Sequence, residues 1–180
     1  CGGIRMKQAL LGSQIFCGER FYDDHALLVD GKSIVDIVDK NNTPDNFNKI
    51  ELDQGILAPG FIDLQVNGGG GVLFNNSPNK ESLNAIIKAH QFFGTTSVMP
   101  TVISDSLEVL EQCIKTVTEE IKNNSSLLGI HIEGPFFNTK YRGVHQKQYI
   151  STINSDYLNL FESLKGFPVM LTLAPECISS

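Results

Sequence analysis

Several features are missing from these 180 residues, and each absence excludes a class of protein. No apolar run approaches the ~20 residues of a membrane-spanning helix, and the first residues lack the apolar stretch of a signal peptide. Lysine and arginine form no cluster and the net charge is -6, so neither nucleic acid nor a membrane is an expected partner. The four cysteines include no CxxC pair, which argues against a thiolate zinc site and a disulfide framework. A cytoplasmic protein with reduced thiols is expected.

The pattern of apolar residues changes near residue 58. Residues 1–5 look like a cloning remnant before a natural start at Met6. Between 6 and 58 short β-like segments predominate, and Asp30-Gly31 between two of them is a strong hairpin signal. The predicted strands are 9–11, 15–16, 26–29, 33–38 and 50–52, with a polar loop at 41–48. Such a small sheet buries too little to stand alone, so it needs strands or a surface from elsewhere.

From residue 59 to 180 the pattern switches to strands that alternate with helices. Predicted strands cover 61–66, 95–102, 127–132 and 169–174. Strands separated by helices pair in parallel, since a tight hairpin cannot connect parallel strands. Their apolar sequences suggest that helices or other layers cover both faces of the sheet.

Three helices are predicted between these strands. Ser77-Pro78 suggests the N-cap and first residue of one helix, which would bury Leu83, Ile86, Ile87 and Phe93 and end at Gly94. Asp105 with Glu108 resembles a capping box for a second helix. Its apolar residues recur at spacings of three and four, at Leu107, Leu110, Ile114, Val117 and Ile121. A long polar loop at 138–152 precedes a third helix at 156–164.

Two α/β architectures fit this order: an open doubly wound sheet and a (β/α)8 barrel. Four strand–helix units would form only half of a barrel, which needs eight units and about 250 residues. The sequence also stops just after a predicted strand, at Ser179-Ser180. We therefore expect an N-terminal piece of a longer protein.

Polar residues recur at the carboxyl ends of the predicted strands, where barrel enzymes gather their active sites. Gln65 and Asn67 alternate with Val66, so both amides point to one side, although two amides that satisfy loop backbone would look the same. The glycines at 68–71 match neither a phosphate loop nor a dinucleotide fingerprint and suggest a sharp turn or close approach of a ligand.

Glu133 ends an apolar strand, and a carboxylate at that position is costly without a partner. It could be a metal ligand, a general base or a structural group that caps a loop. His131 lies two residues earlier and points the same way if the strand is regular. A catalytic zinc often takes two histidines and a glutamate. The remaining histidines offer no convincing pair, because His25 and His90 lie at positions that favour structural roles and only His145 follows a strand.

Two segments together resemble the amidohydrolase superfamily, and within it the N-acetylglucosamine-6-phosphate deacetylases. The segments are Ala58-Pro59-Gly60-Phe61-Ile62-Asp63-Leu64-Gln65-Val66-Asn67-Gly68, where typical members of the superfamily have His-x-His, and Gly129-Ile130-His131-Ile132-Glu133-Gly134-Pro135-Phe136. Leu173-Ala174-Pro175-Glu176 fits the same family. The resemblance runs from Met6 to Glu176 and covers the N-terminal half of such an enzyme.

This resemblance implies the first half of a (β/α)8 metal-dependent hydrolase barrel at 59–180 and part of a β-sandwich lobe at 6–58. It implies that Glu133 is a metal ligand, that Val144 and His145 contact substrate, and that Gln65 and Asn67 replace the histidines of two-metal relatives. One divalent metal is then expected, with zinc first and iron, cobalt or manganese as alternatives, because amides bind zinc poorly compared with imidazole. The catalytic aspartate and two histidine ligands would lie beyond residue 180.

The implied reaction is metal-assisted hydrolysis of the acetamide of N-acetylglucosamine 6-phosphate. The products would be glucosamine 6-phosphate and acetate, and His145 would orient the sugar or its phosphate. The implied full-length protein is a homodimer, and this chain alone would be inactive. Two alternatives stay open: another amidohydrolase that acts on a cyclic amide, and a relative that binds a sugar phosphate without catalysis.

Overall fold

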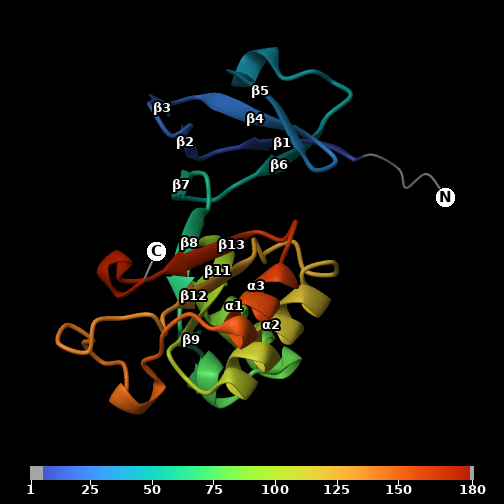
Figure 1. The fold of residues 1–180 in the computed structure, drawn as a ribbon. Coiled ribbons are helices and arrows are strands. Elements are labelled where there is room, and N and C mark those ends of the chain that lie inside the picture. Colours follow the sequence, from blue (N-terminus) through green and yellow to red (C-terminus); the bar gives the residue numbers. More distant parts are fainter. Residues whose placement is uncertain (1–5, 179–180) are drawn as a thin grey trace. The chain divides into compact units, whose positions relative to one another are not determined.

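The computed structural model describes residues 6–178. The predicted remnant at 1–5 and the end at Ser179-Ser180 lie outside the described residues. The chain divides into two compact units between Pro59 and Gly60, and each is considered by itself (Figure 1).

The first unit contains two small sheets. One has the strand order β5-β4-β1-β6 and the other the order β3-β2-β7. The strands are β1 (Lys7–Leu11), β2 (Gln14–Phe16), β3 (Phe21–Tyr22), β4 (His25–Asp30), β5 (Ser33–Asp39), β6 (Asn48–Glu51) and β7 (Ile56–Leu57). The 3-10 helix η1 (Lys40–Asn42) follows β5. The predicted hairpin is confirmed, because β4 and β5 pair antiparallel around Gly31, whose φ is 63°.

The core of the first unit is small. Its buried apolar cluster contains Ala9, Leu11, Ala26, Leu28 and Phe47. Large apolar side chains stay exposed on β5, where Ile34 is 71% and Val35 55% exposed. The unit thus has the limited core that its short strands predicted.

The second unit is built on a four-stranded parallel sheet. Its order is β13-β12-β11-β8, and every neighbouring pair is parallel. The strands are β8 (Phe61–Val66), β11 (Thr95–Ile103), β12 (Ile130–Glu133) and β13 (Val169–Thr172). Three helices lie on one face of the sheet: α1 (Lys80–Gln91), α2 (Leu107–Glu120) and α3 (Ser155–Glu162) (Figure 1). The predicted parallel α/β arrangement is confirmed for this unit.

The glycine run forms a tight hairpin rather than a long loop. Strands β9 (Gly68–Gly69) and β10 (Val72–Leu73) pair antiparallel. Gly70 and Gly71 between them have φ of 59° and 82°, which glycine adopts at little cost. The sharp turn predicted for this run is therefore present. The 3-10 helices η2 (Phe74–Asn76), η3 (Lys147–Tyr149) and η4 (Pro175–Cys177) complete the unit.

The two helix caps predicted from the sequence are wrong. Asn79, not Ser77, caps α1, since its side chain accepts a hydrogen bond from the Ser82 N–H. Pro78, which lies between Ser77 and Asn79, contacts α2 instead: its carbonyl oxygen accepts a 2.8 Å hydrogen bond from the Thr116 hydroxyl. Ser106, not Asp105, caps α2.

The reasons for the Asp105 result and for two further differences are also local. Both oxygens of the Asp105 carboxylate are engaged elsewhere, because Oδ2 accepts a hydrogen bond from Asn75 and Oδ1 accepts one from the Ser106 backbone N–H. Phe93 is 77% exposed rather than buried, since α1 ends at Gln91 and its periodicity stops there. The third strand begins at Ile130, three residues later than predicted, and Leu127 pairs with Val98 only as an isolated bridge. A Cβ at Gly129 would lie 2.1 Å from the Pro168 carbonyl oxygen.

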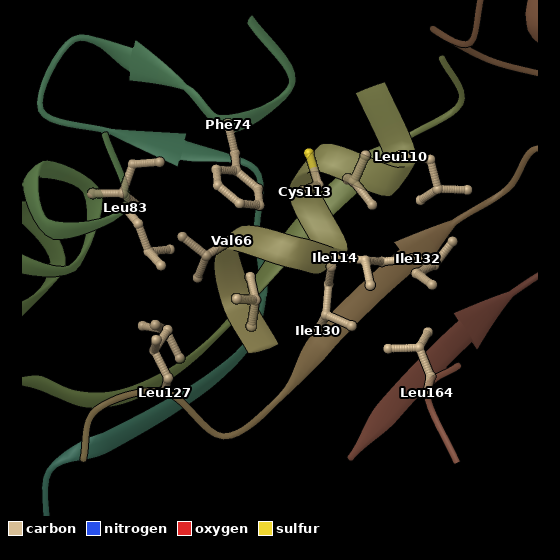
Figure 2. Close-up of a cluster of buried hydrophobic side chains, with 14 of the residues drawn as sticks. Val66, Phe74, Leu83, Leu110, Cys113, Ile114, Leu127, Ile130, Ile132 and Leu164 are labelled. Atoms are coloured by element: carbon tan, nitrogen blue, oxygen red, sulfur yellow. The ribbon is translucent and has the colours of Figure 1, made fainter. Parts of the chain in front are cut away.

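The main core fills the space between the parallel sheet and its helices. Figure 2 shows Val66, Ile130 and Ile132 of the strands against Leu110, Cys113 and Ile114 of α2. Leu83, Ile86 and Ile87 of α1 join them, as the sequence predicted. Apolar side chains on the two outer strands stay exposed in this chain, namely Phe61, Ile62, Leu64, Val169 and Leu171. Among the described residues there is no helix that is long and apolar enough to cross a membrane.

Candidate functional site

Glu133 and Gln65 meet at the carboxyl end of the parallel sheet. The Gln65 Nε2 donates a hydrogen bond of 3.1 Å to the Glu133 Oε2. These residues belong to β12 and β8, which are separated by β11. Because neighbouring strands lie about 4.8 Å apart, this contact spans roughly 10 Å of backbone separation. The structure therefore joins two of the predicted site residues.

His145 approaches Glu133 from the loop after β12. It is 6% exposed, and its Nε2 lies 3.7 Å from the Glu133 Oε1, too far for a hydrogen bond. The backbone N–H of Ser104 donates to the His145 Nδ1 over 3.4 Å, and the Ser104 hydroxyl lies 2.9 Å from the same nitrogen. An N–H can only donate, so Nδ1 is the acceptor and the neutral ring carries its proton on Nε2. His145 thus directs an N–H toward the carboxylate side of the site.

A cleft of about 440 Å³ opens beside these two residues. It is lined by Glu133, Phe137, Tyr141, Arg142, Gly143, Val144, His145 and Thr172. The Val144 side chain is 83% exposed, while the ring of Phe137 lies 4.5 Å from that of His145. The Arg142 guanidinium donates to the His145 carbonyl oxygen, which ties the loop back on itself. The cleft therefore combines apolar walls with a carboxylate and an imidazole N–H.

Asn67 stands apart from the Gln65–Glu133 contact. Its Nδ2 is buried and has no hydrogen-bond partner among residues 6–178. A buried donor without a partner costs about 1–3 kcal/mol. An acceptor oxygen from water or a ligand would remove that cost. The two amides on β8 thus differ, because Gln65 is satisfied by Glu133 and Asn67 is not.

His131 lies two residues before Glu133 on β12, between the neighbouring strands β11 and β13. It is 2% exposed, with its Nδ1 3.2 Å from the Thr101 hydroxyl and its Nε2 2.8 Å from the Thr172 hydroxyl. Burial lowers the pKa of His131, although nearby Glu133 and a hydrogen bond with the Leu64 backbone act in the opposite direction. The other two histidines make backbone contacts, His90 with Gly68 O and His25 with Asp23 O.

The donor set suits a metal ion only in part. Within residues 6–178 there is no cluster of three or more histidine, cysteine or acidic side chains that could hold a metal. Glu133 nevertheless has the character of one ligand, because its Oε2 is fixed by Gln65 while its Oε1 makes no hydrogen bond to His145. One carboxylate oxygen thus stays available at the cleft.

Two contributors to the site were not identified from the sequence. Ser104 follows the last residue of β11 and holds His145 through its N–H and its hydroxyl. Thr172 is the last residue of β13 and lies opposite Glu133 in the strand register. Both stand at carboxyl ends of strands, so the rule that selected Glu133 could have selected them. Serine and threonine are common at strand ends, so their presence alone does not predict a site residue.

A parallel sheet with amides, a carboxylate and a histidine at its carboxyl ends, preceded by a small β unit, is similar to the amidohydrolase type of metal-dependent hydrolase. Comparison with known proteins makes the likeness specific. Residues 8–57 match the NagA composite domain. The chain is 33% identical over 172 residues to the N-acetylglucosamine-6-phosphate deacetylase of Haemophilus influenzae, covering 95% of this chain and 45% of that protein. It is 40% identical over 129 residues to an N-acetylgalactosamine-6-phosphate deacetylase of Shewanella, covering 71% and 33%.

Solved structures agree with the sequence comparisons. The N-acetylglucosamine-6-phosphate deacetylase of Pasteurella multocida superimposes with a TM-score of 0.87 and 31% identity, over 93% of this chain and 45% of that one. The predicted resemblance is confirmed: the chain is similar to the N-terminal part of N-acetylglucosamine-6-phosphate deacetylases and shares the α/β fold of that part. It spans less than half the length of these relatives.

Proposed function

We propose that the complete protein containing this chain hydrolyses the acetamide of N-acetylglucosamine 6-phosphate to glucosamine 6-phosphate and acetate. In this proposal residues 59–180 form the first half of a (β/α)8 barrel, and residues 6–58 form part of a β-sandwich lobe. The observation that carries the proposal is the Gln65–Glu133 contact beside the His145 cleft. It places a carboxylate with one available oxygen where an amide substrate could enter.

Glu133 is proposed as the ligand that this chain contributes to one divalent metal, with zinc as the first candidate. The metal would act as a Lewis acid that polarises the acetamide carbonyl and lowers the pKa of a water molecule. Gln65 keeps one Glu133 oxygen hydrogen-bonded, which orients the carboxylate for a single cation. A segment outside this chain would supply the remaining ligands and the aspartate that acts as general acid and base.

His145 and Val144 are proposed to contact the sugar phosphate. The His145 Nε2–H can donate to a hydroxyl or phosphate oxygen, because Ser104 holds the opposite nitrogen. Exposed Val144 would pack against the sugar ring. The unpartnered Nδ2 of Asn67 is available to donate to an oxygen near the metal or to the acetamide carbonyl.

The partner expected of the complete protein is therefore a small amino-sugar phosphate. A homodimeric, cytoplasmic enzyme is proposed on the resemblance alone. N-acetylgalactosamine 6-phosphate is a second candidate substrate, because a deacetylase named for that sugar is 40% identical to this chain. The two sugars differ only in the configuration of one hydroxyl, so one site could bind either.

The test is acetate release by the complete protein, with zinc measured per protein molecule. N-acetylglucosamine 6-phosphate, N-acetylgalactosamine 6-phosphate and a cyclic amide are compared as substrates. We expect Glu133→Gln to lose bound zinc and at least about 100-fold in activity, since it removes a charged ligand. Glu162→Gln, which changes an exposed carboxylate on α3 paired with Lys165, is the matched control and should behave like the wild type.

Three results would refute the proposal in different ways. Hydrolysis of the cyclic amide alone would indicate another amidohydrolase. Sugar-phosphate binding without acetate release or zinc would indicate a non-catalytic relative. Full activity of Glu133→Gln would exclude Glu133 from the chemistry.

A further inference from the structure

A chain of hydrogen bonds runs through the carboxyl ends of all four parallel strands. The backbone N–H of Val66 on β8 donates to the Thr101 hydroxyl on β11 over 2.9 Å. The same hydroxyl lies 3.2 Å from the His131 Nδ1 on β12. The His131 Nε2 lies 2.8 Å from the Thr172 hydroxyl on β13. One imidazole thus connects strands that are not neighbours in the sheet.

The position of His131 would suit an apolar side chain equally well. Its neighbours Ile130 and Ile132 are at most 1% exposed, and His131 itself is 2% exposed. A polar group costs free energy in such a place unless both of its nitrogens are hydrogen-bonded. A neutral imidazole has one donor and one acceptor nitrogen, and a threonine hydroxyl can take either role. The Thr101 hydroxyl also donates to the Met99 carbonyl oxygen over 3.2 Å, so it accepts from the His131 Nδ1–H, and the Thr172 hydroxyl donates to Nε2.

Backbone hydrogen bonds already hold these strands together. The hydrogen bonds through Thr101, His131 and Thr172 add a constraint on how far one strand can shift along its neighbour. Thr101 and His131 are opposite each other, as are Glu133 and Thr172. His131 therefore reaches diagonally, from its own level to the level of Glu133 on the next strand. This diagonal bond fixes where β13 ends relative to β12.

Each link of the chain lies next to a residue of the candidate site. His131 and Glu133 are two residues apart on one strand and point to the same side. Val66 directly follows Gln65, whose amide must cross β11 to reach Glu133. A small shift of β8 against β12 would break that 3.1 Å contact. The Thr101 hydroxyl connects these two strands through β11 and opposes such a shift.

We propose that His131 is a positioning residue, which holds Gln65 and Glu133 at a fixed distance by connecting Thr101 and Thr172. The metal-ligand role of Glu133 in this inference rests on the proposed function. The positioning itself concerns the Gln65–Glu133 contact and exists without any metal. A merely structural histidine would stabilise the unit without affecting that contact.

The experiment removes one link of the chain in the complete protein. Thr172→Val removes the hydroxyl with little change of shape, and Thr172→Ser keeps it. Thr96→Val, at the amino end of β11, is the matched control. Three readouts are compared: zinc affinity by competition with a chelator, melting temperature without metal, and the side-chain amide NMR signal of Gln65 after selective ¹⁵N-glutamine labelling.

The expected result is specific to the site. Thr172→Val should weaken zinc binding about 10-fold or more, the usual effect of losing a group that orients a ligand. It should also shift the Gln65 amide signal toward that of a free amide. Thr172→Ser should restore both, and Thr96→Val should change neither. Acetate release by His131→Gln should fall in kcat with KM within about twofold, because His131 does not line the cleft, whereas Thr172 does.

The outcomes separate this inference from the proposed function. Wild-type protein that binds no zinc and releases no acetate refutes the proposed function, and the Gln65 signal then still decides whether His131 positions the pair. An unchanged Gln65 signal in Thr172→Val, with a lower melting temperature, would overturn the inference. His131→Gln provides a second variant, and its Gln65 signal should move in the same direction as in Thr172→Val.

Discussion

Gly134 offers a sharp test of how the loop after β12 shapes the site. It directly follows Glu133 and has a φ of 88°, which side chains rarely adopt. A Cβ at this position would lie 2.2 Å from the Ser104 Oγ and 2.8 Å from the Phe137 ring. Both of these side chains hold His145. Gly134→Ala should therefore disturb His145 through its two neighbours, Ser104 and Phe137.

Gly143 in the same loop is the matched control. It also has a positive φ, 58°, but a Cβ there would meet nothing within 4 Å. Strain from the left-handed conformation should cost about 1–2 kcal/mol in both variants. Only Gly134→Ala adds overpacking, which costs about 1–3 kcal/mol in a packed site. We expect Gly143→Ala to lose about 1–2 kcal/mol and Gly134→Ala about 2–5 kcal/mol.

Rotation of Ser104 could relieve part of the clash, but it would break the hydroxyl contact with the His145 Nδ1. That bond is worth about 0.5–1.5 kcal/mol, so the relief carries its own cost. The assay is urea unfolding of the complete protein, with the His145 ring signals followed by NMR. Equal destabilisation by the two alanine variants, or unchanged His145 signals in Gly134→Ala, would refute the reasoning.

Three further predictions concern single contacts. Ser106→Ala should destabilise the protein by about 0.5–2 kcal/mol in urea unfolding, since it removes the side-chain cap of α2. Cys17 should react with iodoacetamide before Cys113 when labelling is read by mass spectrometry. The exposed Cys17 thiol has a lowered pKa, mainly through a hydrogen bond with the Arg20 backbone, whereas burial raises the pKa of Cys113 to about 12. The pKa of Asp24 lies below its ordinary value, mainly because Lys40 hydrogen-bonds the carboxylate. The stabilisation from this pair should be present above the unfolded pKa and disappear as the pH falls through the folded pKa, and a carboxyl ¹³C NMR titration should show a higher pKa in Lys40→Met.

The parallel sheet was predictable because its strands carry a strong, local signal. The segment at 61–66 lies between Gly60 and Asn67, and it forms β8 with the predicted limits. The helix faces followed equally well from apolar spacing, since Leu110, Ile114 and Val117 are all buried. Such periodicity reports burial directly, and burial against a sheet is what fixes a helix in place.

The helix ends were not predictable for a tertiary reason. Ser77-Pro78 has the residue types of a helix start, but the Pro78 carbonyl accepts a hydrogen bond from Thr116 of α2 and α1 begins only at Lys80. Asp105 has a side chain that could cap α2, but its Oδ2 accepts a hydrogen bond from Asn75 of η2 instead. A cap is worth only about 1 kcal/mol, so one competing contact is enough to move it by a residue or two.

The sequence indicated which residues gather at the site but not how they contact one another. Strand ends of a parallel sheet share one edge, so Gln65 and Glu133 could be expected near each other. Both amides carry the same donor and acceptor groups, so the residue types alone do not tell which one bonds Glu133. In the structure Gln65 reaches Glu133, while the Nδ2 of Asn67 has no partner among residues 6–178.

This difference between the two amides bears on how many cations the site can hold. A carboxylate that bridges two metals needs both of its oxygens free, but the Gln65 amide occupies the Glu133 Oε2 with an N–H donor. Histidine at that position could offer a lone pair to a cation, whereas the amide nitrogen of glutamine offers only hydrogens. His145 cannot substitute, since its Nδ1 accepts from Ser104 and its Nε2 carries the proton. These contacts support the proposal of a single cation held through the Glu133 Oε1.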